Sequence, residues 1–286
     1  MIRLHDIRYV RLGTRDLGAA SRYATSVLGL EAAGGANGAL HFRSDQRDHT
    51  LVYFDGDPAD HTSGFEVAGV AELDAAAAEI EAQKLPVRHG TRDECEARRC
   101  AAFIHFTDPS GNGIDLVAGA DASRNAWRAS RNAGITGFSH IGLRTTDAKR
   151  DEAFWTRVCS ARVSDRIGDA PLLRIDEIHH KIALFPSACA GVQHVNHQVE
   201  SFDDVMRAYY FLRERCVRIV FGPGRHPTSS AIFLYFEGPE GMVYEYSTGV
   251  KSITDEAAHR PRQFPFEPAS FCMWGSKPDI PEFRNE

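Results

Sequence analysis

Three side chains that can take part in acid-base or metal chemistry lie close together near the C-terminal end of the chain: His226, Tyr235 and Glu245. Tyr235 belongs to the β-branched and aromatic run at 232–236, and Glu245 belongs to the apolar run at 242–246. A Gly-Pro-Glu-Gly turn sequence separates the two runs, so the segment predicts a β-hairpin. A carboxylate in an apolar strand is costly to bury unless a cation meets it. Glu245 is therefore either a metal ligand or a residue on a solvated face.

Histidines in two other predicted strands can join this carboxylate. His140 lies in the strand expected at 138–145, and the strand expected at 192–199 carries both His194 and His197. The last two are three residues apart, so they point to opposite faces of a strand and only one can line the site. Two histidines and one carboxylate are the protein ligands of mononuclear non-haem Fe(II) centres that keep open positions.

The composition limits the kinds of partner. The chain has 286 residues, of which 43% are hydrophobic and 25% charged, and this length predicts two domains. A formal net charge of -6 argues against binding to nucleic acid or to anionic membranes. The six cysteines form no CxxC pair, and neither a signal peptide nor a membrane-spanning run is recognised. We therefore expect a cytoplasmic protein that binds a small molecule, with no nucleic-acid or membrane partner.

The two halves of the chain repeat one plan. Residues 138–147 match residues 7–16, and a helical segment follows in each half. The hairpin at 236–245 matches that at 106–115, and each ends on an acidic residue four positions after the turn glycine. A period of about 130 residues indicates an internal duplication. Each half is expected to contain the order strand, helix, strand, strand, strand.

A polar connector separates the two halves. The boundary falls at 119–134, which contains the polar run 121–124 and a run rich in serine, arginine and asparagine at 128–132. We place an N-terminal module at 1–132 and a C-terminal module at 133–286. Tyr9 and Asp115 of the first module stand where the second has its first histidine and its carboxylate. The position that matches the second histidine offers no imidazole, unless a shift in register brings His61 into it, so we expect the first module to bind no metal.

The motifs of the second half carry a resemblance to a known family. They are Phe-Ser-His at 138–140, His194 ahead of the Asp-Asp-Val helix start at 203–205, and Pro-x-Gly-x-x-x-Glu-Tyr at 239–246. Over essentially its whole length the chain resembles the type I extradiol catechol dioxygenases of the vicinal oxygen chelate superfamily. The resemblance implies an α+β fold of two modules, each a pair of βαβββ repeats that form a small half-open barrel.

The resemblance also implies a ligand set. It assigns the metal to His140, His194 and Glu245 of the C-terminal module, and the spacing to the following helix selects His194 over His197. The family often has a histidine directly before the second ligand, and here that residue is Gln193. The metal implied is Fe(II), with Mn(II) as the alternative because both ions accept the same ligands.

Three further residues receive roles from the resemblance. His179 stands, by its spacing to His194, where the family has its acid-base histidine, and His180 beside it is the alternative. A histidine suits this role because its ordinary pKa lies near neutrality. His226 and Tyr235 match residues that hydrogen-bond the hydroxyl groups of the substrate.

The implied reaction is extradiol (meta) ring cleavage of a substituted catechol, with O2 as co-substrate, by an enzyme expected to be a homo-oligomer. A biphenyl-type, cumate-type or related 2,3-dihydroxy aromatic compound is the expected substrate. A glyoxalase-type metal isomerase is the alternative enzyme, and it would need a second carboxylate ligand. A non-catalytic antibiotic-binding protein on the same scaffold would need no metal ligands.

The C-terminal tail contains several prolines after residue 252, so it predicts neither a long helix nor a central strand. The resemblance suggests that the tail folds over the mouth of the C-terminal barrel. Its aromatic residues are then expected to line or pack against the site, and they are Phe264, Phe266, Phe271 and Trp274. Arginines that could pair with a substrate carboxylate are Arg225, Arg260 and Arg262.

Overall fold

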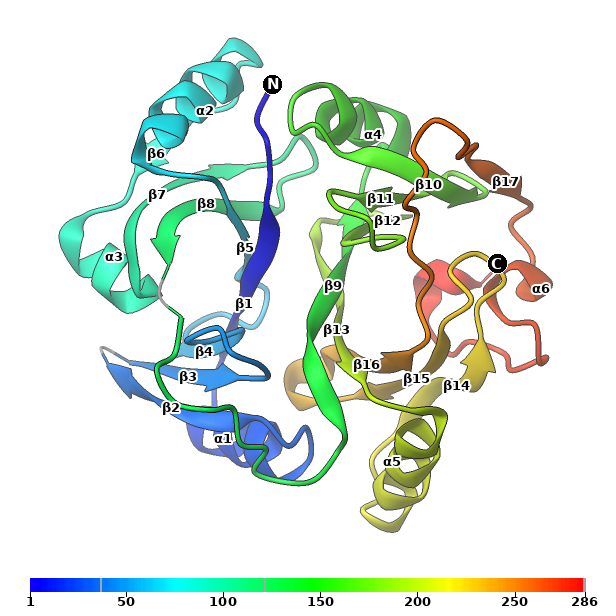
Figure 1. Ribbon diagram of the computed structural model, residues 1–286. Helices are drawn as coiled ribbons and strands as arrows, with labels where there is room; N and C mark the ends of the chain where they lie inside the picture. The colour runs from blue at the N-terminus through cyan, green and yellow to red at the C-terminus, as the bar shows by residue number, and fades with distance from the viewer. Residues whose placement is uncertain (37, 121, 285–286) are drawn as a thin grey trace.

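Two curved β-sheets, one from each half of the chain, form the frame of the molecule (Figure 1). The computed structural model describes residues 1–36, 38–120 and 122–284. The elements of the first half are, in chain order, β1 (Asp6–Thr14), α1 (Leu17–Ser26), β2 (Glu31–Ala36), β3 (Ala39–Arg43), β4 (Leu51–Asp55), β5 (His61–Glu66), α2 (Val70–Ala82), β6 (Arg88–His89), α3 (Arg92–Arg98), β7 (Cys100–Thr107) and β8 (Gly113–Ala120).

The second half repeats this order without a counterpart of α3, and then adds a tail. Its repeated elements are β9 (Ile135–Thr145), α4 (Ala148–Arg157), β10 (Arg162–Ile167), β11 (Ala170–Arg174), β12 (Ile182–Pro186), β13 (Gly191–Val199), α5 (Phe202–Glu214), β14 (Ile219–Arg225), β15 (Ile232–Glu237), the 3-10 turn η1 (Pro239–Gly241) and β16 (Val243–Thr248). The tail contains β17 (Arg262–Phe264), α6 (Pro268–Phe271) and the 3-10 turn η2 (Pro281–Phe283).

Each half is built from two βαβββ repeats. In the first half, β1 pairs in parallel with β4 and β5 pairs in parallel with β8, while β1 and β5 lie side by side and antiparallel. In the second half the corresponding pairs are β9 with β12, β13 with β16, and β9 with β13. The sheets have the strand orders β2-β3-β4-β1-β5-β8-β7-β6 and β14-β15-β16-β13-β9-β12-β11-β10-β17. The predicted α+β fold of paired repeats is confirmed, and the boundary at 132 stays a prediction.

Side-chain caps start the helices at equivalent places in the two halves. Asp16 accepts a hydrogen bond from the amide of Ala19 at the start of α1, and Asp147 accepts one from the amide of Arg150 at the start of α4. Ser201 caps α5 in the same way. These bonds satisfy amide groups that the first turn of a helix leaves without a partner. The capped helices show that local sequence marks the turn from strand to helix in these three repeats, whereas α2 starts at Gly69 without a side-chain cap.

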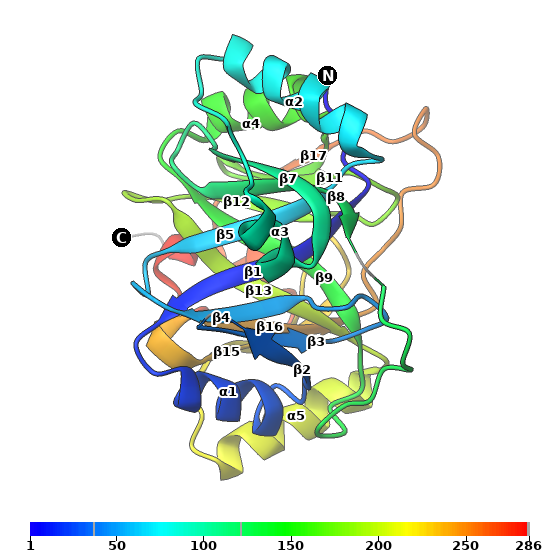
Figure 2. The same cartoon turned by 90° about the vertical axis from the view of Figure 1, so that its left-hand side faces the viewer.

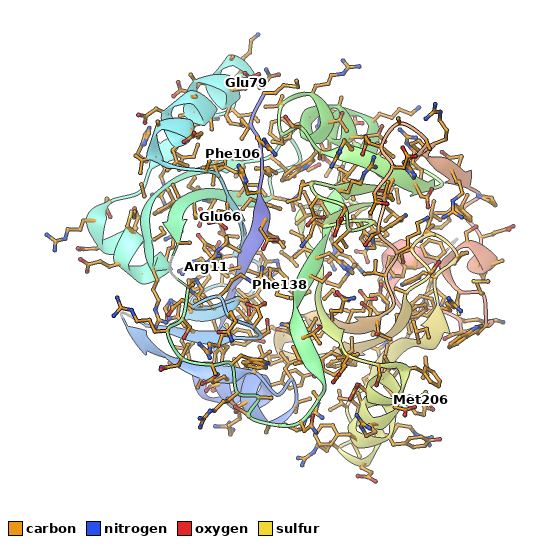
Figure 3. The ribbon with its side chains drawn as sticks, in the orientation of Figure 1. Arg11, Glu66, Glu79, Phe106, Phe138 and Met206 are labelled. Carbon is orange, nitrogen blue, oxygen red and sulfur yellow. The ribbon has the colours of Figure 1, made fainter. Side chains whose placement is uncertain are left out.

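The apolar core continues from one half into the other. The helices lie at two ends of the molecule, α2 with α4 at one end and α1 with α5 at the other (Figure 2). At the first end the ring of Phe65 lies 5.4 Å from that of Trp155, and Phe106 (Figure 3) lies 6.1 Å from Phe154. Residues of α4 thus pack against strands of the other half. Among the described residues, no helix is long and apolar enough to cross a membrane.

The tail adds a strand to the edge of the second sheet and then returns to the barrel. The strand β17 pairs in parallel with β10. Phe271 is buried, and Phe264 and Phe266 pack against the same apolar cluster, as expected. The expectation for Trp274 is wrong, because the chain leaves the barrel mouth after Cys272 and the indole is 50% exposed.

Packing between the halves can be tested with Trp155→Ala. Because the indole is fully buried against the other half, its loss should lower the free energy of unfolding by about 3–5 kcal/mol. Denaturant unfolding followed by circular dichroism measures the change. Tyr210→Ala is the matched control, since that ring is 58% exposed and its loss should change stability little. Equal effects of the two substitutions would contradict a shared core.

Candidate metal centre

Three neighbouring strands in the middle of the second sheet, β16, β13 and β9, carry the predicted metal ligands. Asn196 of β13 lies opposite both His140 of β9 and Glu245 of β16. His194 lies two residues before Asn196 and therefore points to the same face of the sheet. Strand register alone thus brings two histidines and a carboxylate from distant parts of the chain to one place.

The three side chains meet at distances that suit a bound ion. The Nε2 atom of His140 lies 3.1 Å from Nε2 of His194 and 3.0 Å from Oε2 of Glu245. Nε2 of His194 lies 3.5 Å from the same carboxylate oxygen. Neighbouring donors of an octahedral ion with bonds of about 2.1 Å lie about 3 Å apart. The donors therefore fit one face of an octahedral site.

The carboxylate of Glu245 is buried without enough partners. Only 1% of the residue is exposed, and its Oε2 atom has no hydrogen-bond partner. Burial raises the pKa of Glu245, but the nearby His140, His226 and His194 lower it by more. The pKa of Glu245 therefore lies below the usual range of a glutamate. A buried charge in this state needs a cation. The missing partner fits a divalent metal ion.

The second ligand is held in the tautomer that a metal requires. Burial lowers the pKa of His194 to about 3, so its imidazole is neutral. Nδ1 of His194 donates a hydrogen bond to the side-chain oxygen of Gln193. Nε2 is then unprotonated, and its lone pair is available on the side of Glu245. Gly142 is needed opposite, because a Cβ there would collide with this ring. His197 points to the other face and packs against Phe138.

The structure brings His226 and Tyr235 beside the ligands. Tyr235 lies directly opposite Glu245 in the sheet, and its hydroxyl lies 3.2 Å from Nε2 of His226. That nitrogen lies 3.7 Å from the carboxylate of Glu245, while Nδ1 donates to the carbonyl of Phe271. Burial, and then the charge of Glu245, raise the pKa of Tyr235 well above its usual value, so the phenol keeps its proton.

His180, and not His179, faces the ligands. The ring centroid of His180 lies 4.2 Å from that of His140. Nε2 of His179 instead contacts Asp165 at 2.9 Å, and its Nδ1 lies 3.0 Å from Nδ1 of His180. The choice of His179 from spacing stays a prediction, and the side chain on this face is that of His180, the stated alternative. Both histidines precede β12 in an irregular segment, where counting from a distant ligand does not fix the direction of a side chain.

In the first half, a guanidinium group pairs with Asp115, the carboxylate equivalent to Glu245. The hydroxyl of Tyr9 donates to Asp115 over 2.8 Å, and Nε of Arg98 donates to the same oxygen over 2.6 Å. Nδ1 of His105 donates to the other oxygen. His49 stacks on Tyr9 with ring centroids 5.1 Å apart, whereas the ring of His180 is tilted against that of His140 in the second half. Asp115 is therefore neutralised by the protein itself.

No imidazole replaces the second ligand in the first half. The register places Thr62 at that position. His61 points toward the other half, where its Nδ1 accepts a hydrogen bond from the amide of Val192. Arg11 lies within the ring of strands (Figure 3). Across the part of the chain that the structure describes, the C-terminal triad is the only cluster of three potential metal ligands.

Two functional features escaped the sequence analysis. The helix α3, which carries Arg98 to Asp115, lies in a stretch with no predicted element, although Thr91 and Glu94 form a capping box there. That spacing of a threonine and a glutamate is a usable sequence signal. Nothing in the sequence indicated that Asp165 would support His179, because the contact joins β10 to the irregular segment before β12.

A fold of four βαβββ repeats with a metal-ligand triad in one pair defines a class of duplicated metal-binding proteins. Residues 6–116 and 137–246 match the model of the Glyoxalase/Bleomycin resistance protein/Dioxygenase superfamily, and the chain belongs to this superfamily. Each match covers one pair of repeats.

Similar proteins are named for ring-cleaving enzymes and for a glyoxalase. The chain is 27% identical over 279 residues to the iron-dependent extradiol dioxygenase of Rhodococcus jostii strain RHA1, covering 89% of this chain and 92% of that protein. It is 27% identical to the 3-methylcatechol 2,3-dioxygenase of Pseudomonas putida strain F1, covering 88% and 92%. The Mn(II)-bound glyoxalase from Novosphingobium aromaticivorans has a TM-score of 0.88 at 25% identity, covering 100% and 95%.

The ligand assignment predicts that Glu245→Gln lowers metal content. The amide keeps the shape but removes the charge that the ion would neutralise, so most bound iron should be lost after reconstitution and gel filtration. Elemental analysis by mass spectrometry measures the ratio of metal to protein. Asp115→Asn in the first half is the matched control and should keep the wild-type ratio. Full iron occupancy in Glu245→Gln would contradict the assignment.

Proposed function

We propose that the protein is an extradiol dioxygenase that opens the ring of a substituted catechol with O2 at a mononuclear Fe(II). The observation that carries this proposal is the buried triad of His140, His194 and Glu245, whose carboxylate has one oxygen without a partner. The names of the relatives support the same reaction. A cytoplasmic location and a homo-oligomeric state belong to the same proposal.

The three ligands would hold the ion and leave positions for other ligands. When bound, Fe(II) would supply a template on which a catechol and dioxygen are held side by side, and Mn(II) accepts the same donors. The protein would add a dry environment, because the three ligands are buried in the sheet. Exclusion of water strengthens the hydrogen bonds and charges that orient the substrate.

His226 and Tyr235 would orient the hydroxyl groups of the catechol. The two groups lie 3.2 Å apart and adjacent to the carboxylate ligand, so a hydroxyl placed at the ligands comes within reach of both. The tautomer of His226 follows from its surroundings, because Nδ1 donates to a backbone carbonyl and Nε2 is left as an acceptor. His226 can therefore take a proton from the catechol, while Tyr235 donates to its oxygen.

A chain of hydrogen bonds prepares His180 to move a proton. Asp165 is a carboxylate because Arg262 lies 2.6 Å away, and it accepts from Nε2 of His179. Nδ1 of His179 then carries a lone pair and accepts from Nδ1 of His180, which leaves Nε2 of His180 as an acceptor beside His140. We therefore assign the acid-base role to His180 and a positioning role to His179.

The isomerase alternative lacks a ligand. A glyoxalase-type site needs a second carboxylate, and Glu245 is the one carboxylate of the triad within the described residues. Asp115 lies in the other half and is bound to Arg98. A protein that only binds a small molecule and catalyses no reaction would not need a buried carboxylate that requires a cation. The dioxygenase reaction therefore uses more of the observed groups than either alternative does.

The function is tested by oxygen uptake of the Fe(II)-reconstituted protein with a panel of catechols that carry alkyl, aryl or carboxylate groups. We expect uptake together with the yellow colour of the ring-opened product. A protein that binds iron stoichiometrically and yet consumes no oxygen with any catechol would contradict the proposal. Isomerisation of a hemithioacetal by the same preparation would then support the glyoxalase alternative.

The two adjacent histidines should respond differently to substitution. His180→Gln should lower kcat by roughly 100- to 10,000-fold, because it removes the group that moves the proton. His179→Gln should cost only roughly tenfold, because it removes a support of that group. Both variants should keep the wild-type iron content, measured beside the steady-state rates. A larger loss in His179→Gln than in His180→Gln would reverse the assignment.

A further inference from the structure

The last turn of the described chain, η2, closes the mouth of the C-terminal barrel with an aromatic ring. Phe283 is only 4% exposed. Its ring centroid lies 4.7 Å from Phe185, 5.0 Å from Phe271 and 6.0 Å from Tyr235. Phe185 and Tyr235 in turn lie 6.0 Å and 5.2 Å from the ring of the ligand His194. Phe283 therefore occupies an aromatic space one ring away from the metal centre.

The residue before it places a carboxylate on an arginine of the same barrel. Glu282 lies 2.5 Å from Nε of Arg144, and its side chain is 7% exposed. Arg144 belongs to β9 and follows His140 by four residues, so it points to the face that carries the ligand. NH1 of Arg144 donates to the carbonyl of Val192, which fixes the guanidinium group in place. The other oxygen of Glu282 is buried and has no hydrogen-bond partner.

We propose that Phe283 and Glu282 occupy the positions that the ring and the carboxylate of the substrate take when it binds. The substrate is then a catechol with a carboxylate side chain, and Arg144 determines this specificity. This inference rests on the proposed function, because it concerns the same metal centre. A catechol needs an aromatic space beside the ligands, and Phe283 fills such a space. A carboxylate entering a half-buried site needs a fixed cation. The guanidinium group of Arg144 is such a cation, since it already pairs with the carboxylate of Glu282.

The tail can yield this space because side-chain contacts, and not pairing with a strand, hold η2 against the barrel. The turn η2 has three residues, lies at the end of the described chain and is not part of a sheet. Asp279, just before it, is tied separately to Arg218 at the surface and to the backbone of Val220. The chain can therefore turn about Ile280 while its earlier part stays in place. The unpartnered oxygen of Glu282 makes the displaced contact weaker than a fully satisfied ion pair.

The arginines suggested by the sequence do not offer this contact. Arg262 is paired with Asp165, the residue that supports the acid-base pair of histidines. Arg225 and Arg260 are exposed, and each donates to backbone carbonyls near it in the chain. The structure therefore moves the expected carboxylate contact from these residues to Arg144.

The test compares a dihydroxyphenylpropionate with its methyl ester, which has the same ring but no charge. The wild-type enzyme should have a KM for the acid about tenfold lower than for the ester. Arg144→Met should abolish this difference by raising the KM for the acid to that of the ester. Arg218→Met is the matched control, since it breaks the ion pair with Asp279 just before η2, and it should keep the preference. Arg144→Lys, which keeps the charge without the fork, should keep part of it.

A second variant separates substrate mimicry from a merely structural role. Glu282→Gln removes the competing carboxylate, so the KM for the acid should fall several-fold while the KM for the ester stays the same. A structural role of Glu282 predicts a change of equal size for both compounds. Equal KM values for acid and ester in the wild type, or a higher KM for the acid in Glu282→Gln, would overturn the proposal.

Binding without turnover distinguishes this inference from the proposed function. Isothermal titration of the Fe(II)-reconstituted protein, kept free of O2, with phenylpropionate, which cannot be cleaved, should show binding that Arg144→Met loses and Arg218→Met keeps. If no catechol is cleaved but this pattern is found, the aryl-carboxylate site stands and the dioxygenase function fails. If catechols are cleaved but phenylpropionate does not bind, the inference on Arg144 fails alone.

Discussion

The structure depends on the cost of burying a carboxylate in the middle of a sheet. Both halves place an acidic residue at the same point of the same scaffold, Asp115 in the first and Glu245 in the second, and both must supply a positive partner. The first half uses Arg98, brought in by an extra helix, and its charge is permanently satisfied. The second half surrounds its carboxylate with imidazoles and leaves one oxygen without a partner. An exchangeable cation can enter only where no fixed cation is present, and this difference separates scaffold from active site.

How much of this could be predicted depends on whether a residue lies in a regular strand. His140, His194 and Glu245 lie in strands, where alternation and register follow from the sequence pattern, and the predicted group is the one that the structure assembles. His179 and His180 lie in an irregular segment, where the amide of His179 donates to the carbonyl of the distant Lys251, so spacing alone could not decide which of the two faces the ligands. Local chemistry fixed the strands and caps, and tertiary contacts decided the rest.

Direct contacts join the two halves near the ligand strands. Trp155 of the second half packs on Phe65 of the first, and Glu240, in the turn before the strand of the carboxylate ligand, accepts a hydrogen bond from the amide of Arg15. The amide of Val192, two residues from the second ligand, is bonded to His61 of the first half. The first half therefore supports the backbone on both sides of the ligand strands. Its value to the site is mechanical, since precise ligand positions need neighbours that do not move.

The ligands come from different repeats: His140 stands in the first strand of one, and His194 and Glu245 stand in the first and last strands of the next. Neither repeat alone contains a complete site. A bound ion would therefore act as a cross-link that closes a loop of about 100 residues, the kind of link that restricts an unfolded chain most. Loss of the ion would loosen the union of two repeats as well as the centre itself. Iron supply and the lifetime of the folded half would then be linked.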